Sequence, residues 1–518
     1  MKKMKRYLAL PLAMLLMVGC DKGFEGINTN PYALTSINPA LLFTNAQRTT
    51  HPGFWEGEQT IVQQFLNAYN TGATAGFNFN EDNNNFNAPR WNDNYPNSVK
   101  LIQQIISLVK DDNTRTNLYN QVRIWKAYVF MTLVDTYGDV PYSNAGKAYL
   151  EANFYPTYDK DEDIYDDLYA ELKAATAALD PTKDMVIEDL LYGTSGSAAN
   201  QVALWKKLGN SLLLRLGMRY SKIDQNKART IVQEAYNGGV MQSNADNALI
   251  QFSSVYNNPL NAGPRGTNPY FYYLAEPFVN QLKSTFDPRL KYISGKYSDP
   301  NQVLALTPDT TLANQYGFPV GYDQTSVLTY PGYRGTNGTG QNYSQLNFTV
   351  FGSATAPVFY VTNAQTKLLL AEAAFKGWLT GLSGAQTAQE YYEAGVIASM
   401  DEYARYPNVM SPAVTSAEKT FYLSQTGVAY DPANALRQIN TQYWIACVGN
   451  GAESFANFRR SGFPTLTPNG YNNNLQGGFV RRMAYPNEEA SRNNTNYQDA
   501  VTSLGGNDNL VTRVFWDN

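Results

Sequence analysis

Histidine and cysteine are nearly absent from this chain, whose 518 residues contain one His and two Cys. A Ser-His-Asp triad, a His-rich zinc site or a His acid/base pair would each have to be built around His51 alone. Charge is also scarce, because 16% of the residues are charged, against about a quarter in an ordinary soluble domain. The apolar fraction of 43% is ordinary, which excludes a disordered chain and allows a large core. The composition therefore favours binding over histidine-based catalysis.

No apolar run in the sequence is long enough to span a bilayer as a helix. The N-terminus comes nearest, with a basic head followed by about twelve mainly apolar residues, 7–18, a length that suits a signal peptide. The stretch Leu16-Met17-Val18-Gly19-Cys20 resembles a bacterial lipoprotein signal, in which the cysteine is lipidated and becomes the new N-terminus. Cleavage near Gly19 by ordinary signal peptidase is the alternative.

These features predict three parts. We expect residues 1–19 to be the signal peptide, residues 20–39 a tether that is lipid-anchored through Cys20, and residues 40–518 a single domain. Removal of the signal peptide deletes four positive charges and takes the formal net charge from −4 to −8. A chain this acidic lacks the excess of positive charge with which proteins bind nucleic acid. The other cysteine, Cys447, lies in an apolar stretch, so we expect a buried, inert thiol.

Apolar residues recur at three- and four-residue steps in several segments, which is the spacing of amphipathic helices. The segments are residues 117–137, 161–179, 201–220, 362–377, 389–403 and 431–448. In the last of them, Asp431 is expected to cap a helix whose first residue is Pro432. Because the segments come in close pairs, we expect a mostly α-helical fold of tetratricopeptide-like hairpins with long irregular loop insertions.

Three long intervals between these helices are rich in Asn and aromatic residues: residues 71–97, 256–273 and 319–343. Flat rings fit the apolar face of a sugar, and Asn or Arg side chains fit its hydroxyls. Each ring fits a place in the core equally well, and Trp91 can also open a helix. The candidate ligand-binding residues are Phe77, Phe79, Asn83, Phe86, Trp91, Tyr256, Tyr272, Tyr322, Tyr333 and Arg334.

Several patterns that resemble catalytic or metal motifs are better explained as structure. Asp135 and Asp139 lie four residues apart around a glycine, which is typical of a helix end. Residues 159–163 begin like a calcium loop but lack its Gly and Glu, so acidic residues at a helix N-terminus explain them better. Residues 193–197 are expected to form a turn, and His51 to lie at the surface or at a helix cap. We expect no cofactor, no metal and no enzymatic activity, although a carboxylate pair for glycoside hydrolysis needs no His and stays open.

Motifs along nearly the whole chain resemble the SusD/RagB family of nutrient-binding outer-membrane lipoproteins. The most recognisable stretch runs through residues 123–142, with RIWKAY followed by VDTYGDVPY. The other matching segments are residues 20–31, 158–165, 205–216, 286–290, 371–373, 458–464 and 481–494. The resemblance implies an α-helical fold with tetratricopeptide-like units. It also implies a location on the outer membrane, facing the cell exterior, and a SusC-type TonB-dependent barrel as the partner.

We therefore predict a cell-surface, lipid-anchored protein that captures oligosaccharides through the three loops and passes them to the SusC-type barrel. Known ligands of the family are oligosaccharides in some members and peptides in others, so a RagB-like oligopeptide receptor is a competing hypothesis. A lipid-anchored glycoside hydrolase, which needs a carboxylate pair, is a second one. A third is a scaffold that stabilises the barrel without a ligand of its own.

Overall fold

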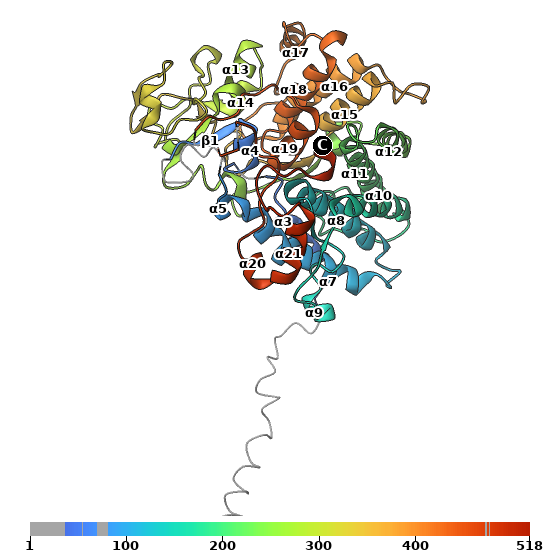
Figure 1. The fold of residues 1–518 in the computed structure, drawn as a ribbon. Coiled ribbons are helices and arrows are strands. Elements are labelled where there is room, and N and C mark those ends of the chain that lie inside the picture. Colours follow the sequence, from blue (N-terminus) through green and yellow to red (C-terminus); the bar gives the residue numbers. More distant parts are fainter. Residues whose placement is uncertain (1–36, 54, 70–80, 472–473, 476) are drawn as a thin grey trace, which may run out of the picture.

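The computed structural model describes residues 37–53, 55–69, 81–471, 474–475 and 477–518 (Figure 1). The expected signal peptide, the lipidation site Cys20, most of the tether and the candidate residues Phe77 and Phe79 lie outside the described residues. No helix that the structure describes combines the length and the apolar character needed to cross a membrane.

The fold is mostly helical, as the sequence predicts, and consecutive helices pack side by side (Figure 1). The longer helices are α3 (Pro39–Thr49), α7 (Lys100–Val109), α8 (Thr116–Tyr137), α10 (Asp161–Ala178), α11 (Ala198–Arg219), α12 (Gln225–Gly238), α13 (Glu276–Ser284), α15 (Asn363–Phe375), α16 (Ala388–Asp401), α17 (Ser416–Leu423), α18 (Ala435–Ala446), α19 (Gly451–Ser461) and α21 (Asn494–Ser503). Helix α8 packs against α7 and α10, α11 against α10 and α12, and α15 against α16 and α18. These neighbouring pairs form the helical scaffold that carries the loops.

Local capping explains where several of these helices begin. The side chain of Ser197 caps α11, and that of Thr362 caps α15 as part of a capping box. One predicted start is wrong by a few residues: Asp431 caps a short 3-10 turn, Pro432–Asn434, and α18 begins only at Ala435. Proline fits the first position of either kind of helix, so its position does not distinguish them.

Short antiparallel strand pairs connect segments that lie apart in the sequence, except for the last pair, which is a local hairpin. The pairs are β1 (Phe65–Asn67) with β5 (Tyr272–Leu274), β2 (Val140–Pro141) with β3 (Tyr158–Asp159), β4 (Ala248–Ile250) with β10 (Val358–Val361), β6 (Ser294–Gly295) with β9 (Gln345–Leu346), and β7 (Thr336–Asn337) with β8 (Gly340–Gln341). The predicted loop intervals are therefore not wholly irregular. The first of them also holds α5 (Asn84–Asn87), α6 (Pro89–Asp93) and the π-helix η2 (Asn94–Val99).

The motifs explained as structure have structural roles. The Asp135 carboxylate accepts a hydrogen bond from Tyr165 and pairs with Arg219. Gly138, whose φ is +79°, caps the C-terminal end of α8. Acidic residues fill the first turn of α10, and a turn precedes α11. Cys447 is fully buried, and burial raises the pKa of its thiol. These predictions are confirmed.

The core contains ion pairs as well as apolar side chains. Glu453 of α19 accepts from Arg219 Nη2 at 2.7 Å and lies 3.3 Å from Arg215 Nε, both on α11. Arg460 of α19 forms two hydrogen bonds with Glu372 of α15, at 2.8 and 2.7 Å. All these side chains are buried. The ion pairs therefore hold α19 against α11 and α15 in the interior.

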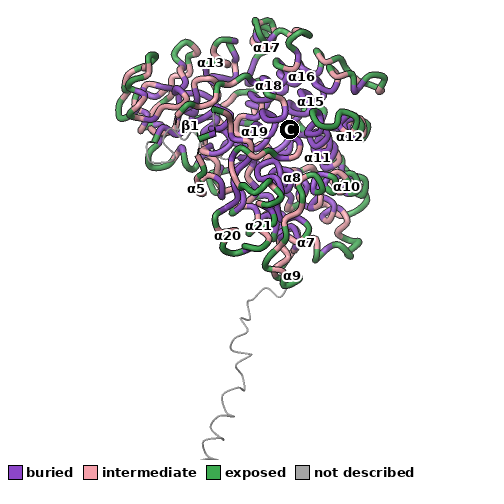
Figure 2. The backbone as a smooth tube through the Cα atoms, viewed as in Figure 1, coloured by how far each residue is buried: buried purple, intermediate pink, exposed green. Residues whose placement is uncertain are grey.

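A large core fills the helical scaffold, and a second, small core lies apart from it. Figure 2 shows buried backbone concentrated around α8, α11, α15, α18 and α19, with exposed loops outside. The small core consists of Leu66, Ala68, Tyr273, Ala275, Phe318, Val327 and Tyr343. It lies beneath the loops at the upper left of Figure 1, so these loops have an apolar support of their own.

Candidate functional site

The predicted binding loops rest on the antiparallel pair of β1 and β5. Phe65 lies opposite Leu274, and Asn67 lies opposite Tyr272. Side chains alternate across a strand, so Tyr273 enters the small core and its neighbours point the other way. The ring of Tyr272 stacks on that of Phe65, with the centroids 5.9 Å apart. The strand pair therefore separates the two cores.

A chain of glutamine hydrogen bonds joins the loops to this strand pair. Gln324 donates from its backbone N to Ala68 O at 2.9 Å and from its Nε2 to Tyr270 O at 2.7 Å. Gln341 Nε2 donates to Gln324 O at 3.2 Å, and the Tyr333 hydroxyl donates to Gln341 Oε1 at 2.7 Å. We call the resulting unit, residues 68–69, 269–272 and 316–343, the loop cluster.

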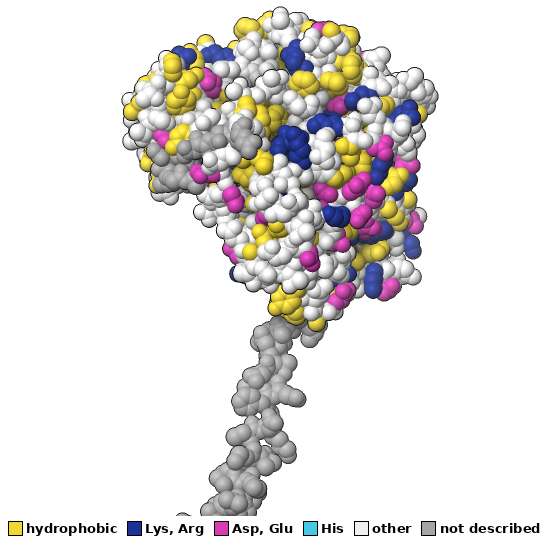
Figure 3. All heavy atoms as spheres, viewed as in Figure 1, with side chains coloured by type: hydrophobic (Ala, Val, Ile, Leu, Met, Phe, Trp, Pro, Cys, Tyr) yellow, Lys and Arg dark blue, Asp and Glu magenta, His cyan; other side chains and the backbone are white. Residues whose placement is uncertain are grey.

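Aromatic rings lie at the surface of the loop cluster. Tyr69 is 40% exposed, and its ring centroid lies 4.6 Å from that of Phe271. Tyr322 and Tyr330 meet edge to face at 5.1 Å and pack on the small core from outside. Figure 3 shows hydrophobic side chains at the surface of this end of the molecule. The rings are thus held by neighbours and still reachable from solvent.

The charged groups of the loop cluster are engaged within the protein. The Arg334 guanidinium lies 3.9 Å from the centroid of the Tyr316 ring. The Tyr330 hydroxyl donates to Glu276 at 3.0 Å, and burial together with this carboxylate raises the pKa of Tyr330 to about 12. Asp323 accepts two backbone N–H groups of its own turn, each at 2.7 Å. Within the described part of the chain, no group of three or more His, Cys, Asp or Glu side chains could hold a metal ion.

The structure brings together Tyr322, Tyr333 and Arg334 from the predicted site residues. Tyr322 and Tyr333 pack on the small core, and the backbone N of Arg334 donates to the hydroxyl of the small-core residue Tyr343 at 3.3 Å. Tyr272 belongs to the same strand pair but faces the large core. The site that these residues define is smaller than the three loops together.

The other described candidates lie elsewhere. Asn83 caps α5, and Phe86 lines a separate cavity of about 110 Å³. Trp91 is buried on α6, with its ring 4.6 Å from that of Tyr95. Tyr256 packs against the large core. The first loop interval therefore folds onto the scaffold after residue 81 and contributes no described ring to the loop cluster.

Sequence reasoning missed four residues of the loop cluster: Tyr69, Phe271, Tyr316 and Gln324. Tyr69 and Tyr316 lie just outside the predicted intervals, and Phe271 stands beside the chosen Tyr272. Wider intervals could have found Tyr69 and Tyr316, whereas Phe271 already lies inside the second interval and was not chosen. Nothing in the sequence marks Gln324, because its role depends on contacts with segments more than fifty residues away.

The single histidine predicts a pH dependence of stability. His51 is half-buried rather than at the open surface, and burial, with the positive charge of Arg90, lowers its pKa from 6.5 to about 4. The unfolded chain therefore takes up a proton near pH 6.5 that the folded protein takes up only near pH 4. We expect a loss of about 2 kcal/mol in the free energy of unfolding between pH 7 and pH 5 from this group. Urea titrations at the two pH values measure it.

His51→Gln is the matched control, since the carboxylates of the protein titrate unchanged in the variant. The variant should lose less stability than the wild type between pH 7 and pH 5. Equal losses in both proteins would contradict the prediction. Because this is the only histidine, NMR of its ring protons reads the pKa directly, without assignment.

Comparisons with known proteins agree with this architecture. Residues 31–486 match the model of a SusD-like family described as starch-binding and associating with the outer membrane. A solved chitin-binding protein is 27% identical with a TM-score of 0.78, covering 93% of this chain and 100% of its own. A SusD-like protein of Bacteroidetes AC2a is 27% identical with a TM-score of 0.77 and the same coverage. A chitin-binding SusD homologue from Flavobacterium johnsoniae shares the fold at 23% identity and a TM-score of 0.72, covering 92% of this chain and 98% of its own. No curated protein matches the chain.

Proposed function

The chain belongs to the SusD-like family, and from this premise we propose that it captures oligosaccharides for uptake and binds them at the loop cluster. The family is described as starch-binding and associating with the outer membrane, and two similar solved proteins are named as chitin-binding. A neutral glycan is therefore the ligand class that the relatives favour.

The observation that carries the proposal is the set of accessible rings on the loop cluster. Tyr69, Tyr322 and Tyr333 are at least partly exposed, and flat rings fit the C–H face of a sugar. Gln324 and Asn342 of the same cluster are partly exposed, and their side chains are amides, which suit hydroxyl groups. Because the carboxylates and the guanidinium of the cluster are already engaged, a neutral ligand displaces few ionic contacts.

We further propose that Cys20 carries the lipid anchor and that the protein faces the cell exterior beside a SusC-type TonB-dependent barrel. The lipoprotein-like signal and the outer-membrane association of the family support this arrangement. Labelling with a radioactive fatty acid in cells, with a Cys20→Ala control, tests the anchor. Purification of the lipidated protein from outer membranes tests the partner, because a barrel of this kind should copurify.

The direct test of the ligand class is calorimetric titration of the purified protein with maltohexaose, chitohexaose and a mixture of tryptic peptides. We expect saturable binding of at least one of the two glycans, because the exposed rings and amides match sugar chemistry. Binding of peptides alone would contradict the proposal and favour a RagB-like receptor. Formation of new reducing ends during the titration would also contradict the proposal, because it would show that the protein cleaves the glycan.

A further inference from the structure

A cavity of about 380 Å³ lies beside a short helix, α9 (Ala148–Glu151). Figure 1 shows α9 at the lower end of the molecule, far from the loop cluster. We call this cavity the α9 cavity, after the helix at its rim. Trp91 and Tyr95 line it from α6 and η2, and Tyr149 and Phe154 line it from α9 and the chain that follows. Its volume and largely apolar lining are those of a small-molecule site.

The aromatic side chains at the rim of this cavity are strongly exposed. Tyr149 is 87% exposed, Phe154 62% and the adjacent Tyr155 67%. Figure 3 shows hydrophobic side chains gathered at this lower end. Exposed rings so close together are unusual on a soluble surface and mark a place where something docks. Of the other two lining rings, Trp91 packs against both Tyr95 and Tyr137 of the large core.

A residue that lines the cavity also carries a buried acceptor without a partner. Glu488 Oε2 is buried and has no hydrogen-bond partner among the residues that the structure describes. The adjacent carboxylate, Glu489, accepts a hydrogen bond from the Tyr158 hydroxyl at 2.7 Å. A buried acceptor left unpaired costs about 1–3 kcal/mol. A ligand that brings an O–H or N–H donor would remove this cost.

The charges around the α9 cavity balance. Lys100 and Arg492 oppose Glu488 and Glu489 in its lining. A wall with no net charge favours neither an anion nor a cation. The lining therefore combines flat rings, an unpaired acceptor and no net charge, which is the chemistry that recognises a neutral, hydroxyl-bearing ring.

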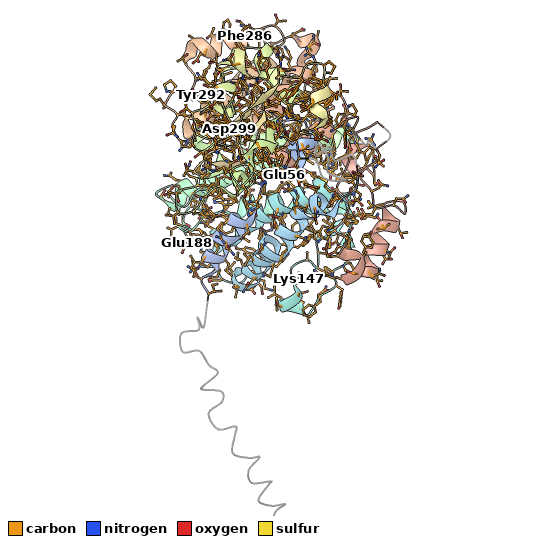
Figure 4. All side chains as sticks on the ribbon, turned by 90° about the vertical axis from the view of Figure 1, so that its left-hand side faces the viewer. Glu56, Lys147, Glu188, Phe286, Tyr292 and Asp299 are labelled. Atoms are coloured by element: carbon orange, nitrogen blue, oxygen red, sulfur yellow. The ribbon has the colours of Figure 1, made fainter. Side chains whose placement is uncertain are left out.

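We propose that the α9 cavity is a second saccharide-binding site, in which the Tyr149 and Phe154 rings stack on the sugar and Glu488 accepts a hydrogen bond from its hydroxyls. This inference rests on the proposed function for its ligand class, and it adds a site that is separate from the loop cluster. In Figure 4, Lys147, next to α9, lies at the lower end. Asp299, which accepts from Thr339 Oγ1 of the loop cluster at 2.7 Å, lies in the upper half. The two places therefore lie in different halves of the molecule.

The test is the stoichiometry of short saccharides on the purified full chain. Calorimetric titration with maltotriose and with chitotriose should find two molecules bound per wild-type chain for at least one of them. In Tyr149→Ala/Phe154→Ala, affinity at one site should fall about tenfold or more, because both stacking rings are gone. Glu488→Leu should weaken the same site, because it removes the acceptor. Phe421→Ala is the matched control, since this ring is also exposed, at 53%, but lies on α17.

Each result supports or overturns the inference. Two sites in the wild type and one in the double variant support it. A single site that the double variant leaves intact and that loop-cluster variants abolish would overturn this inference alone, and the proposed function would stand. Binding at the cavity of a proline-rich peptide, but of neither trisaccharide, would overturn it in favour of a peptide site. No saccharide binding anywhere would overturn both proposals. The rings of Tyr149, Phe154 and Phe421 are exposed, so circular dichroism should show a folded protein after each of these replacements.

Discussion

Replacing Glu453 by alanine should lower the free energy of unfolding by about 3–5 kcal/mol. The carboxylate accepts from Arg219 Nη2 at 2.7 Å and from the Tyr443 hydroxyl at 2.7 Å, and it lies 3.3 Å from Arg215 Nε. All four side chains are buried. Without Glu453, Arg215 has no carboxylate partner among its described ion pairs and Arg219 keeps only Asp135. Positive charge left in the core without compensation is the physical reason for so large a loss.

Urea unfolding followed by tryptophan fluorescence measures this loss as a shift of the midpoint. Glu234→Ala is the matched control, because it removes a carboxylate from an ion pair with Lys173 in which both side chains are at least 36% exposed. We expect the control to cost less than about 1 kcal/mol. Similar midpoints for the two variants would show that the buried network contributes no more than a surface pair, and the prediction would be wrong.

Loss of two rings from the loop cluster should nearly abolish glycan binding there. We expect Tyr322→Ala/Tyr333→Ala to weaken the loop-cluster site about 100-fold, or about 2.7 kcal/mol. The two rings pack on the small core from outside and offer partly exposed faces. Calorimetry in the Tyr149→Ala/Phe154→Ala background measures this site by itself, so that the α9 cavity does not contribute.

Tyr322→Phe/Tyr333→Phe is the control for this second prediction. It keeps both rings and removes only their hydroxyls, one of which donates to Gln341 Oε1 at 2.7 Å. If stacking supplies the affinity, the Phe variant should retain most of it while the Ala variant does not. Unchanged binding in the Ala variant would place the ligand elsewhere and remove the loop cluster from the proposed function.

Much of the scaffold could be predicted because its signals are local. The apolar spacing that indicates a helix over residues 117–137 needs only neighbours three and four positions away, and α8 covers Thr116–Tyr137. Asp135 was recognisable as structural because a glycine three residues later explains the helix end. The 3-10 turn after Asp431 was missed, since the same capping residue and proline suit either helix type.

The candidate site was harder to predict because composition does not report exposure. Trp91 and Tyr322 come from intervals of similar composition, yet Trp91 is buried among rings of the large core and Tyr322 reaches the surface. For the α9 cavity, the sequence pointed to one lining residue, Trp91, but not to the cavity. Its rim and its Glu488 are more than three hundred residues apart in the chain and meet only in the folded protein.

Periodicity, caps and turns along the chain were enough to establish a helical scaffold with Asn- and ring-rich intervals, because each depends on contacts within a few residues. Tertiary structure decided which rings meet and which remain accessible. Strand β1 pairs with β5 about two hundred residues later, and Gln324 of the loop at 319–343 bonds to Ala68 and Tyr270, which flank the two strands. Such pairings depend on the packing of the whole molecule. No pattern of neighbouring residues specifies them.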